Sequence, residues 1–250
     1  MPNSSVTSFP GEIVSIDDSG VRSTMYCPVD AHKHGICSFE YIYFARPDSI
    51  MNGQDIYQAR LNYGQEALGR MPFRRRRRHE RPRLRQCRCS WLCRCFRHPL
   101  RRRLLKNKYM GRTFIQPSQT MRNFGVRVKL NPVRSMIKNR RICIVDDSIV
   151  RGTTVRTRVV KLRELGAREV HFRVSCPPLR HPCFYGINFS SRGELVAANH
   201  PQEALPGLLN LDSLHYLTIE GLLNSVSEPD KYCLACFNGE YPVACGGQCS

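Results

Sequence analysis

The sequence lacks any long hydrophobic run, which excludes the simplest kind of membrane protein. No stretch approaches the roughly 18 to 20 apolar residues that a membrane-spanning helix needs. The first residues, MPNSSVTSFPGEI, show no charged segment followed by an apolar one, so they do not resemble a secretory signal peptide. We therefore expect a cytoplasmic protein that has no membrane partner.

Acidic residues are also scarce, at 20 against 39 lysines and arginines, and the formal net charge is +19. Such an excess ordinarily suggests a polyanionic partner. However, residues 74–103 hold 14 arginines, no lysine and one acidic residue, Glu80, which leaves 25 basic and 19 acidic residues for the rest of the chain. Most of the charge excess is therefore confined to this arginine-rich window.

Cysteine, by contrast, is abundant, with 13 residues. Four of them (Cys87, Cys89, Cys93 and Cys95) lie in the arginine-rich window, and Cys233 and Cys236 form a tight C-x-x-C pair. In a reducing compartment such spacing favours a metal or cluster site over a disulfide. The odd total also argues against a fully paired disulfide framework.

The pattern of apolar residues predicts a mixed α/β chain without internal repeats. Residues 12–17 alternate and precede an Asp-Asp-Ser-Gly turn, as a strand does. Residues 39–44, FEYIYF, are aromatic and β-branched and predict a buried strand. Residues 54–70 have apolar positions close to helical spacing. From about residue 73 to 103, neither the alternation of a strand nor the spacing of a helix is present.

The second half predicts one βαβ unit. Residues 141–145 form a short apolar strand, residues 155–165 an amphipathic helix that Gly166 ends, and residues 170–176 a second strand before two prolines. Such a unit is normally right-handed and belongs to a parallel sheet. Cys143 and Cys176 fall on these strands and are expected in the core.

Two carboxylates, Asp146 and Asp147, stand where the first of these strands ends. Open parallel sheets bind ligands at this edge. The residues that follow, SIVRGTT, are small and hydroxylated, and they lead into a helix N-terminus, which favours a phosphate group. The aspartates suit ribose hydroxyls, directly or through Mg²⁺. The alternative is a capped helix after a solvated acidic turn.

This loop, RICIVDDSIVRGTT, resembles the phosphoribosyl-pyrophosphate loop of type I phosphoribosyltransferases, and in detail that of the amidophosphoribosyltransferases. The resemblance covers roughly residues 10–72 and 104–243. Its ordered blocks are FEYIYFARPDS (39–49), KNKYMGRTFIQPSQTMR (106–122), VKLNPVRS (128–135), PPLRHPCFYGIN (177–188), DSLHYLTIEGLL (212–223) and CLACFNGEYP (233–242). It implies an α/β type I phosphoribosyltransferase fold, with a parallel sheet flanked by helices.

The resemblance also implies a reaction of purine synthesis, in which ammonia displaces pyrophosphate from phosphoribosyl pyrophosphate and 5-phosphoribosylamine forms. Mg²⁺ and basic groups would stabilise the leaving pyrophosphate. Lys106, Tyr109 and Arg112 match the family's flexible loop and are the expected catalytic residues; a solvated basic loop is the alternative. The expected substrate-binding residues are Asp146, Asp147, Ser148, Val150, Arg151, Gly152, Thr153 and Thr154, with both aspartates as Mg²⁺ ligands.

Four cysteines, Cys37, Cys183, Cys233 and Cys236, match the positions where one branch of the family binds a [4Fe–4S] cluster. Four thiolates are what such a cluster requires. A structural Zn²⁺ with four cysteine ligands would fit the same count, and buried free thiols are a further alternative. The family also implies a homo-oligomer and inhibition by purine nucleotides.

The resemblance divides the chain into three parts. Residues 1–38 match an interdomain segment, residues 39–226 the phosphoribosyltransferase domain, and residues 227–250 a tail that carries cysteine ligands. The family's N-terminal glutaminase domain has no match here, so we expect a chain that uses free ammonia or is inactive. A catalytically dead fragment and a nucleic-acid-binding protein, acting through residues 74–103, are the competing functions. We expect any nucleic-acid binding to be non-specific.

Residues 73–103 stand where the family has a strand and a Pro-Asp-Ser-Gly turn that helps to position Mg²⁺ and pyrophosphate. Their length is close to the family's, but their composition is foreign to it. We interpret the window as a compensated frameshift. Translation of the encoding DNA in the other two frames is expected to restore a Pro-Asp-Ser-Gly-like segment there. A DNA sequence in which no frame does so would refute the interpretation.

Overall fold

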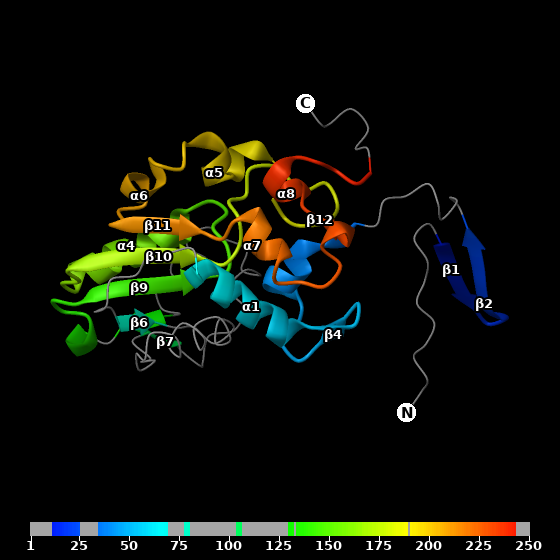
Figure 1. The fold of residues 1–250 in the computed structure, drawn as a ribbon, viewed down its shortest axis with the longest axis horizontal. Helices are drawn as coiled ribbons and strands as arrows, with labels where there is room; N and C mark the ends of the chain where they lie inside the picture. Colours follow the sequence, from blue (N-terminus) through cyan, green and yellow to red (C-terminus); the bar gives the residue numbers. More distant parts are fainter. Residues whose placement is uncertain are drawn as a thin grey trace.

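The computed structural model describes residues 12–25, 35–69, 78–80, 104–106, 130–132, 134–189 and 191–243 (Figure 1). The strands are β1 (Glu12–Asp17), β2 (Gly20–Met25), β3 (Ile36–Cys37), β4 (Ile50–Met51), β5 (Gln54–Asp55), β6 (Arg78–Glu80), β7 (Leu104–Lys106), β8 (Leu130–Pro132), β9 (Arg141–Asp146), β10 (Glu169–Val174), β11 (Ser213–Tyr216) and β12 (Tyr232–Cys233). The α-helices are α1 (Ile56–Gly69), α4 (Thr153–Glu164), α5 (Val196–Asn199), α6 (Leu205–Leu208), α7 (Ile219–Leu223) and α8 (Ala235–Asn238). Shorter helical turns are η2 (Glu40–Phe44), η5 (Arg134–Met136), η6 (Arg192–Glu194) and η7 (Pro229–Lys231). In this described part, no helix is long and apolar enough to span a bilayer.

The central sheet has four parallel strands in the order β11-β10-β9-β6. The chain passes from β9 to β10 through α4, which confirms the predicted βαβ unit. The helix begins two residues before the predicted start. Strand β6 lies inside the arginine-rich window and pairs in parallel with β9, while the rest of that window lies outside the described residues.

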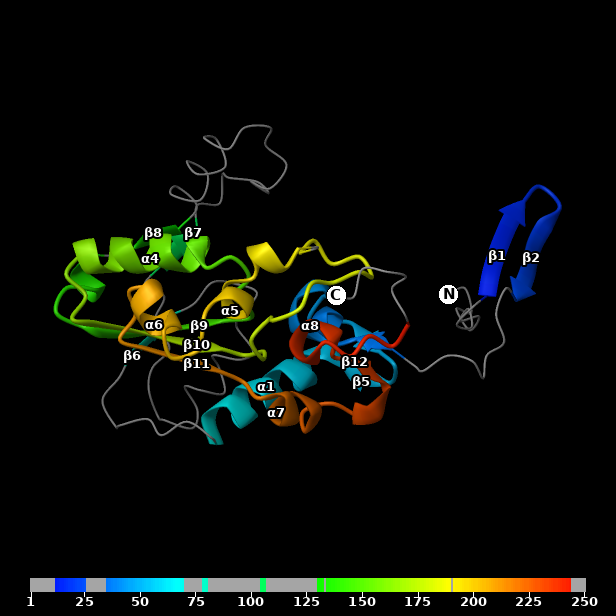
Figure 2. The ribbon, with the colours of Figure 1, turned by 90° about the horizontal axis from the view of Figure 1, so that it is seen from above.

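The core forms where apolar side chains of the sheet meet those of α4. Val155, Val159 and Leu162 are four and three residues apart, so they share one face of α4, and all three are buried. Phe172, near the middle of β10, is fully buried in the same cluster. Figure 2 shows α4 on one side of the sheet and α1 with α7 towards the other. Cys143 and Cys176 are fully buried, as predicted.

The prediction of a strand at residues 39–44 is wrong, because Glu40–Phe44 forms a short π-helix. The buried Arg60 of α1 donates from Nε to the carbonyl oxygen of Tyr41 and from Nη2 to that of Ala45, both at 2.8 Å. Tyr41 and Ile42 are buried all the same. Aromatic and β-branched composition therefore predicted the burial of this segment, while contacts with α1 determined its backbone.

The predicted strand at residues 12–17, its turn and the predicted helix at residues 54–70 agree with the structure. Strand β1 pairs with β2 as an antiparallel hairpin around the predicted turn. Helix α1 lies within the predicted range of residues 54–70.

Strand β3 pairs in parallel with β12, with Cys37 opposite Cys233. Two segments that are far apart in the sequence thus lie side by side. The hydroxyl of Ser38 donates to the carbonyl oxygen of Cys233 at 2.8 Å and adds a side-chain contact to this pairing.

Candidate functional site

The Asp-Asp loop connects β9 to α4 at the carboxyl edge of the sheet. Asp146 is the last residue of β9, and its side chain and that of Asp147 are buried, with 3% and 7% of each residue exposed. Ile149 is buried in the core and holds the middle of the loop against the sheet. The eight predicted substrate-binding residues therefore lie in one continuous turn beside the end of the strand.

Hydrogen bonds fix the two carboxylates. The main-chain N–H of Asp147 donates to Oδ1 of Asp146 at 2.7 Å, and the hydroxyl of Ser148 donates to Oδ1 of Asp147 at 3.0 Å. Arg158, in α4, donates to Oδ2 of Asp146 at 3.0 Å. Ser175, which directly follows β10, donates through its main-chain N–H and its hydroxyl to the carbonyl oxygen of Asp146.

Gly152 makes the turn into α4 and has a φ of 74°, in the left-handed region. A Cβ at this position would lie 2.9 Å from Cδ2 of Leu209. Both the left-handed φ and the lack of room for a side chain therefore favour glycine here. Glycine has no side chain that could cap the helix, and its two successors, Thr153 and Thr154, are exposed at the first turn. The main-chain N–H groups of this turn and the two hydroxyls can therefore donate hydrogen bonds to an anion.

Like Asp146, two further predicted loop residues have partners outside the loop. Arg151 donates from Nη2 to Oε1 of Glu194 at 2.7 Å, and the carbonyl oxygen of Val150 accepts from the N–H of Val196 at 2.9 Å. These contacts hold the loop against η6 and the first residue of α5. Of the predicted catalytic residues, Lys106 ends strand β7, while its side chain, Tyr109 and Arg112 lie outside the described residues.

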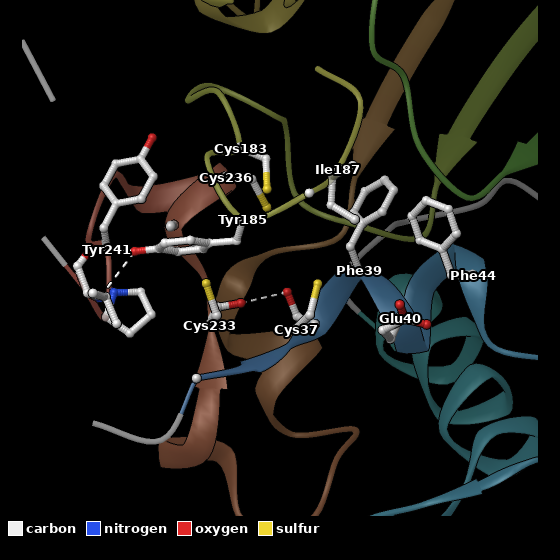
Figure 3. Close-up of a pocket in the computed structure, with 16 residues that line it drawn as sticks. Cys37, Phe39, Glu40, Phe44, Cys183, Tyr185, Ile187, Cys233, Cys236 and Tyr241 are labelled. Atoms are coloured by element: carbon white, nitrogen blue, oxygen red, sulfur yellow. Dashed lines mark hydrogen bonds between the residues drawn. The ribbon is translucent and has the colours of Figure 1, made fainter. Parts of the chain in front are cut away.

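The structure places the four predicted cysteine ligands around one cavity of about 500 Å³ (Figure 3). Cys37 comes from β3, Cys233 from β12 and Cys236 from α8, while Cys183 lies in the loop after β10. All four are free thiols. Three segments that are distant in the sequence thus meet at one site.

Burial raises the pKa of three of these thiols, Cys37, Cys233 and Cys236, and neighbouring thiols of the set raise it further. At neutral pH these groups are therefore protonated in the absence of a positive centre. A cationic group in the cavity would stabilise the thiolates and release their protons. Within the described residues, no three histidine, cysteine or acidic side chains are grouped closely enough to hold a single metal ion.

Aromatic side chains, which sequence reasoning did not select, border the cavity. The hydroxyl of Tyr185 donates to the carbonyl oxygen of Val243 at 2.6 Å and accepts from its N–H at 3.1 Å (Figure 3). The hydroxyl of Tyr241 donates to the carbonyl oxygen of Pro182 at 2.7 Å. These bonds tie the loop that carries Cys183 to the segment that follows α8. The aromatic residues beside Cys183 in the sequence are the signal that could have indicated an aromatic border to the cavity.

Comparisons with known proteins agree over nearly the whole chain. The chain is 43% identical over 236 residues to an amidophosphoribosyltransferase of Synechococcus elongatus, which covers 94% of the chain and 48% of that protein. It is 42% identical to the Bacillus subtilis amidophosphoribosyltransferase and 40% identical to that of Archaeoglobus fulgidus, of which it covers 50% and 52%. The chain thus spans about half the length of the curated relatives it matches. No family model matches it.

Among solved structures, the chain is similar to glutamine phosphoribosylpyrophosphate amidotransferase from B. subtilis complexed with ADP and GMP. The TM-score is 0.76 at 41% identity, and the match covers 93% of this chain and 52% of that one. A second structure, described as the allosteric regulatory enzyme of purine biosynthesis, matches with the same TM-score. The predicted type I phosphoribosyltransferase fold is thereby confirmed.

Replacement of Gly152 by alanine tests the turn into α4. The left-handed φ and the contact with Leu209 are expected to lower the free energy of unfolding by about 1–2 kcal/mol. Denaturant unfolding measures this loss. Gly193→Ala is the matched control, because a Cβ there meets nothing within 4 Å. Equal stability of Gly152→Ala and the unchanged chain would contradict the geometry.

Proposed function

We propose that the chain belongs to the amidophosphoribosyltransferase family and carries out its phosphoribosyl transfer, because it is 43% identical over 94% of its length to one such protein, of which it covers 48%. Ammonia would attack C1 of phosphoribosyl pyrophosphate, the bond from C1 to the pyrophosphate oxygen would break, and 5-phosphoribosylamine would form. This is a step of purine synthesis. The names of the relatives support the class of reaction.

The Asp-Asp loop is the single observation that carries this proposal. A buried strand ends at two carboxylates, and six residues later a helix begins whose first turn has no side-chain cap. The helix dipole and the N–H groups of that turn suit the 5-phosphate. Ser148, Thr153 and Thr154 add hydroxyl donors, and the carboxylates suit the ribose hydroxyls. One short loop therefore offers groups for both parts of the ribose phosphate.

Mg²⁺ is the proposed metal, because carboxylate oxygens are its preferred ligands and it usually binds together with substrate phosphates. Asp146 and Asp147 supply two carboxylates at the edge of the sheet. The metal would neutralise charge on the pyrophosphate as it leaves. Lys106, Tyr109 and Arg112 remain the proposed catalytic residues, with the two basic side chains balancing the same charge.

We propose that Cys37, Cys183, Cys233 and Cys236 hold a [4Fe–4S] cluster, with Zn²⁺ as the less favoured occupant. The cavity they line, at about 500 Å³, has room for a group of several atoms. A single zinc ion would need ligands closer together than those of the described residues. A cluster accepts four thiolates around a larger centre and would tie together the three segments that carry them.

The remaining proposals concern domains and partners. Residues 39–226 would form the phosphoribosyltransferase domain, with residues 1–38 and 227–250 as flanking segments. Purine nucleotides are proposed inhibitors, supported by the ADP and GMP in the B. subtilis structure. We also propose that the chain forms a homo-oligomer and is located in the cytoplasm.

Release of pyrophosphate from phosphoribosyl pyrophosphate, with Mg²⁺ and ammonia present, tests the function. The full chain is expected to turn over, and Asp147→Asn to lower the rate about 100-fold, as loss of one electrostatic contact to a transition state does. Asp230→Asn, an exposed acid in η7, is the matched control. Binding without turnover would mean that the chain binds phosphoribosyl pyrophosphate but does not catalyse its reaction. It would implicate residues 73–103 in the loss of activity. Absence of binding would reject the proposal.

Anaerobic reconstitution with iron and sulfide tests the cluster. The expected result is about four iron atoms per chain and a visible absorption band. Cys236→Ser is expected to lose both, because it removes one of four ligands. Cys143→Ser removes a buried thiol of β9 that does not line the cavity, and it should retain them. One zinc per chain in place of iron would contradict the proposal.

A further inference from the structure

A partly buried ion pair joins Asp146 of the Asp-Asp loop to Arg158 of α4, and the function proposed above gives Arg158 no role. Arg158 donates from Nη1 to Oδ2 of Asp146 at 3.0 Å. The Asp146 side chain is 4% exposed and that of Arg158 is 22% exposed. A carboxylate so deeply buried is costly unless it is paired and hydrogen-bonded. The guanidinium therefore allows Asp146 to be charged at this position.

The pair joins the two ends of the loop. Asp146 is the last residue of β9, and Arg158 is in the second turn of α4, so the contact spans residues 147–152 and the first turn of the helix. Both side-chain oxygens of Asp146 are engaged within the chain, Oδ1 with the N–H of Asp147 and Oδ2 with Arg158. The main-chain carbonyl of Asp146 accepts two further hydrogen bonds from Ser175.

The charge of Arg158 also matters for an anionic ligand. Two adjacent carboxylates place two negative charges beside the helix N-terminus that would hold a phosphate, and their repulsion would oppose the helix dipole. Arg158 balances one of them from the side of the helix. Arg158 thereby lowers the repulsion that a phosphate group at the helix N-terminus would meet.

We infer that Arg158 is a positioning residue, which acts on the ligand through Asp146. Asp146 joins the loop to α4 through this contact, and the contact fixes the position of its carboxylate beside the ribose phosphate. This role rests on the proposed phosphoribosyl site. It goes beyond the proposal, which gives Arg158 no part in ligand binding.

A double-mutant cycle on the full chain tests the inference, with phosphoribosyl pyrophosphate and Mg²⁺ as the probe and calorimetry as the measurement of binding. Arg158→Met and Asp146→Asn are each expected to raise the Kd about tenfold, the loss of one charge-assisted hydrogen bond. The double variant is expected to be no weaker than the weaker single variant, because both act through the same contact. Arg158→Lys, which keeps the charge, should restore part of the affinity.

Arg156→Met is the matched control, because it removes an exposed arginine from the same helix. Its Kd should equal that of the unchanged chain, which separates the ion pair from the general charge of α4. Thermal unfolding of every variant is recorded alongside. If Arg158→Met does not fold, Arg158→Lys replaces it in the cycle and is expected to give the same non-additivity.

Two results would overturn the inference while the proposed function stands. One is binding by Arg158→Met as tight as that of the unchanged chain. The other is a double variant in which the two losses multiply, since Arg158 would then contact the ligand by itself. If the unchanged chain does not bind the probe at all, the proposed function fails and the inference fails with it.

Discussion

The parallel pairing of β9 with β10 is the constraint on which the candidate site depends. Its register places Asp146 opposite Val174, the last residue of β10, so that the residue after the strand, Ser175, donates two hydrogen bonds to the Asp146 carbonyl. A shift of one residue would turn Asp146 to the other face of the sheet and separate it from α4. The apolar contacts of Ile142, Phe172 and Val159 hold that register. The packing of the core therefore also determines the position of the polar loop.

Much of this arrangement could be predicted from local sequence. The strand, loop, helix and strand of residues 141–174 follow from apolar periodicity, a glycine turn and two prolines, and all of these signals act over short distances. The segment at residues 39–44 could not be predicted in this way, because Arg60 holds its backbone from another helix. The partnership of Arg158 and Asp146 was equally hidden, since helical spacing shows which face a residue lies on but not what it contacts.

The cysteine cavity could be predicted from the sequence only in part. Family resemblance selected Cys37, Cys183, Cys233 and Cys236, and the structure places all four around one cavity. Periodicity could not have done so, because their segments are joined by a two-residue strand pairing, β3 with β12, that carries no sequence pattern. Tyr185 and Tyr241 close the same region through bonds to main-chain atoms. Such bonds depend on tertiary packing alone.

The pairing of β3 with β12 also has a consequence for the order in which the molecule assembles. Cys37 and Cys233 are opposite each other in the sheet but nearly 200 residues apart along the chain. Closing so long a loop carries an entropic cost that is recovered only when the intervening sheet is already compact. During synthesis Cys37 leaves the ribosome long before its partners do. The cavity therefore cannot form until the segment that carries Cys233 and Cys236 has been synthesised and the chain before it has folded back onto β3.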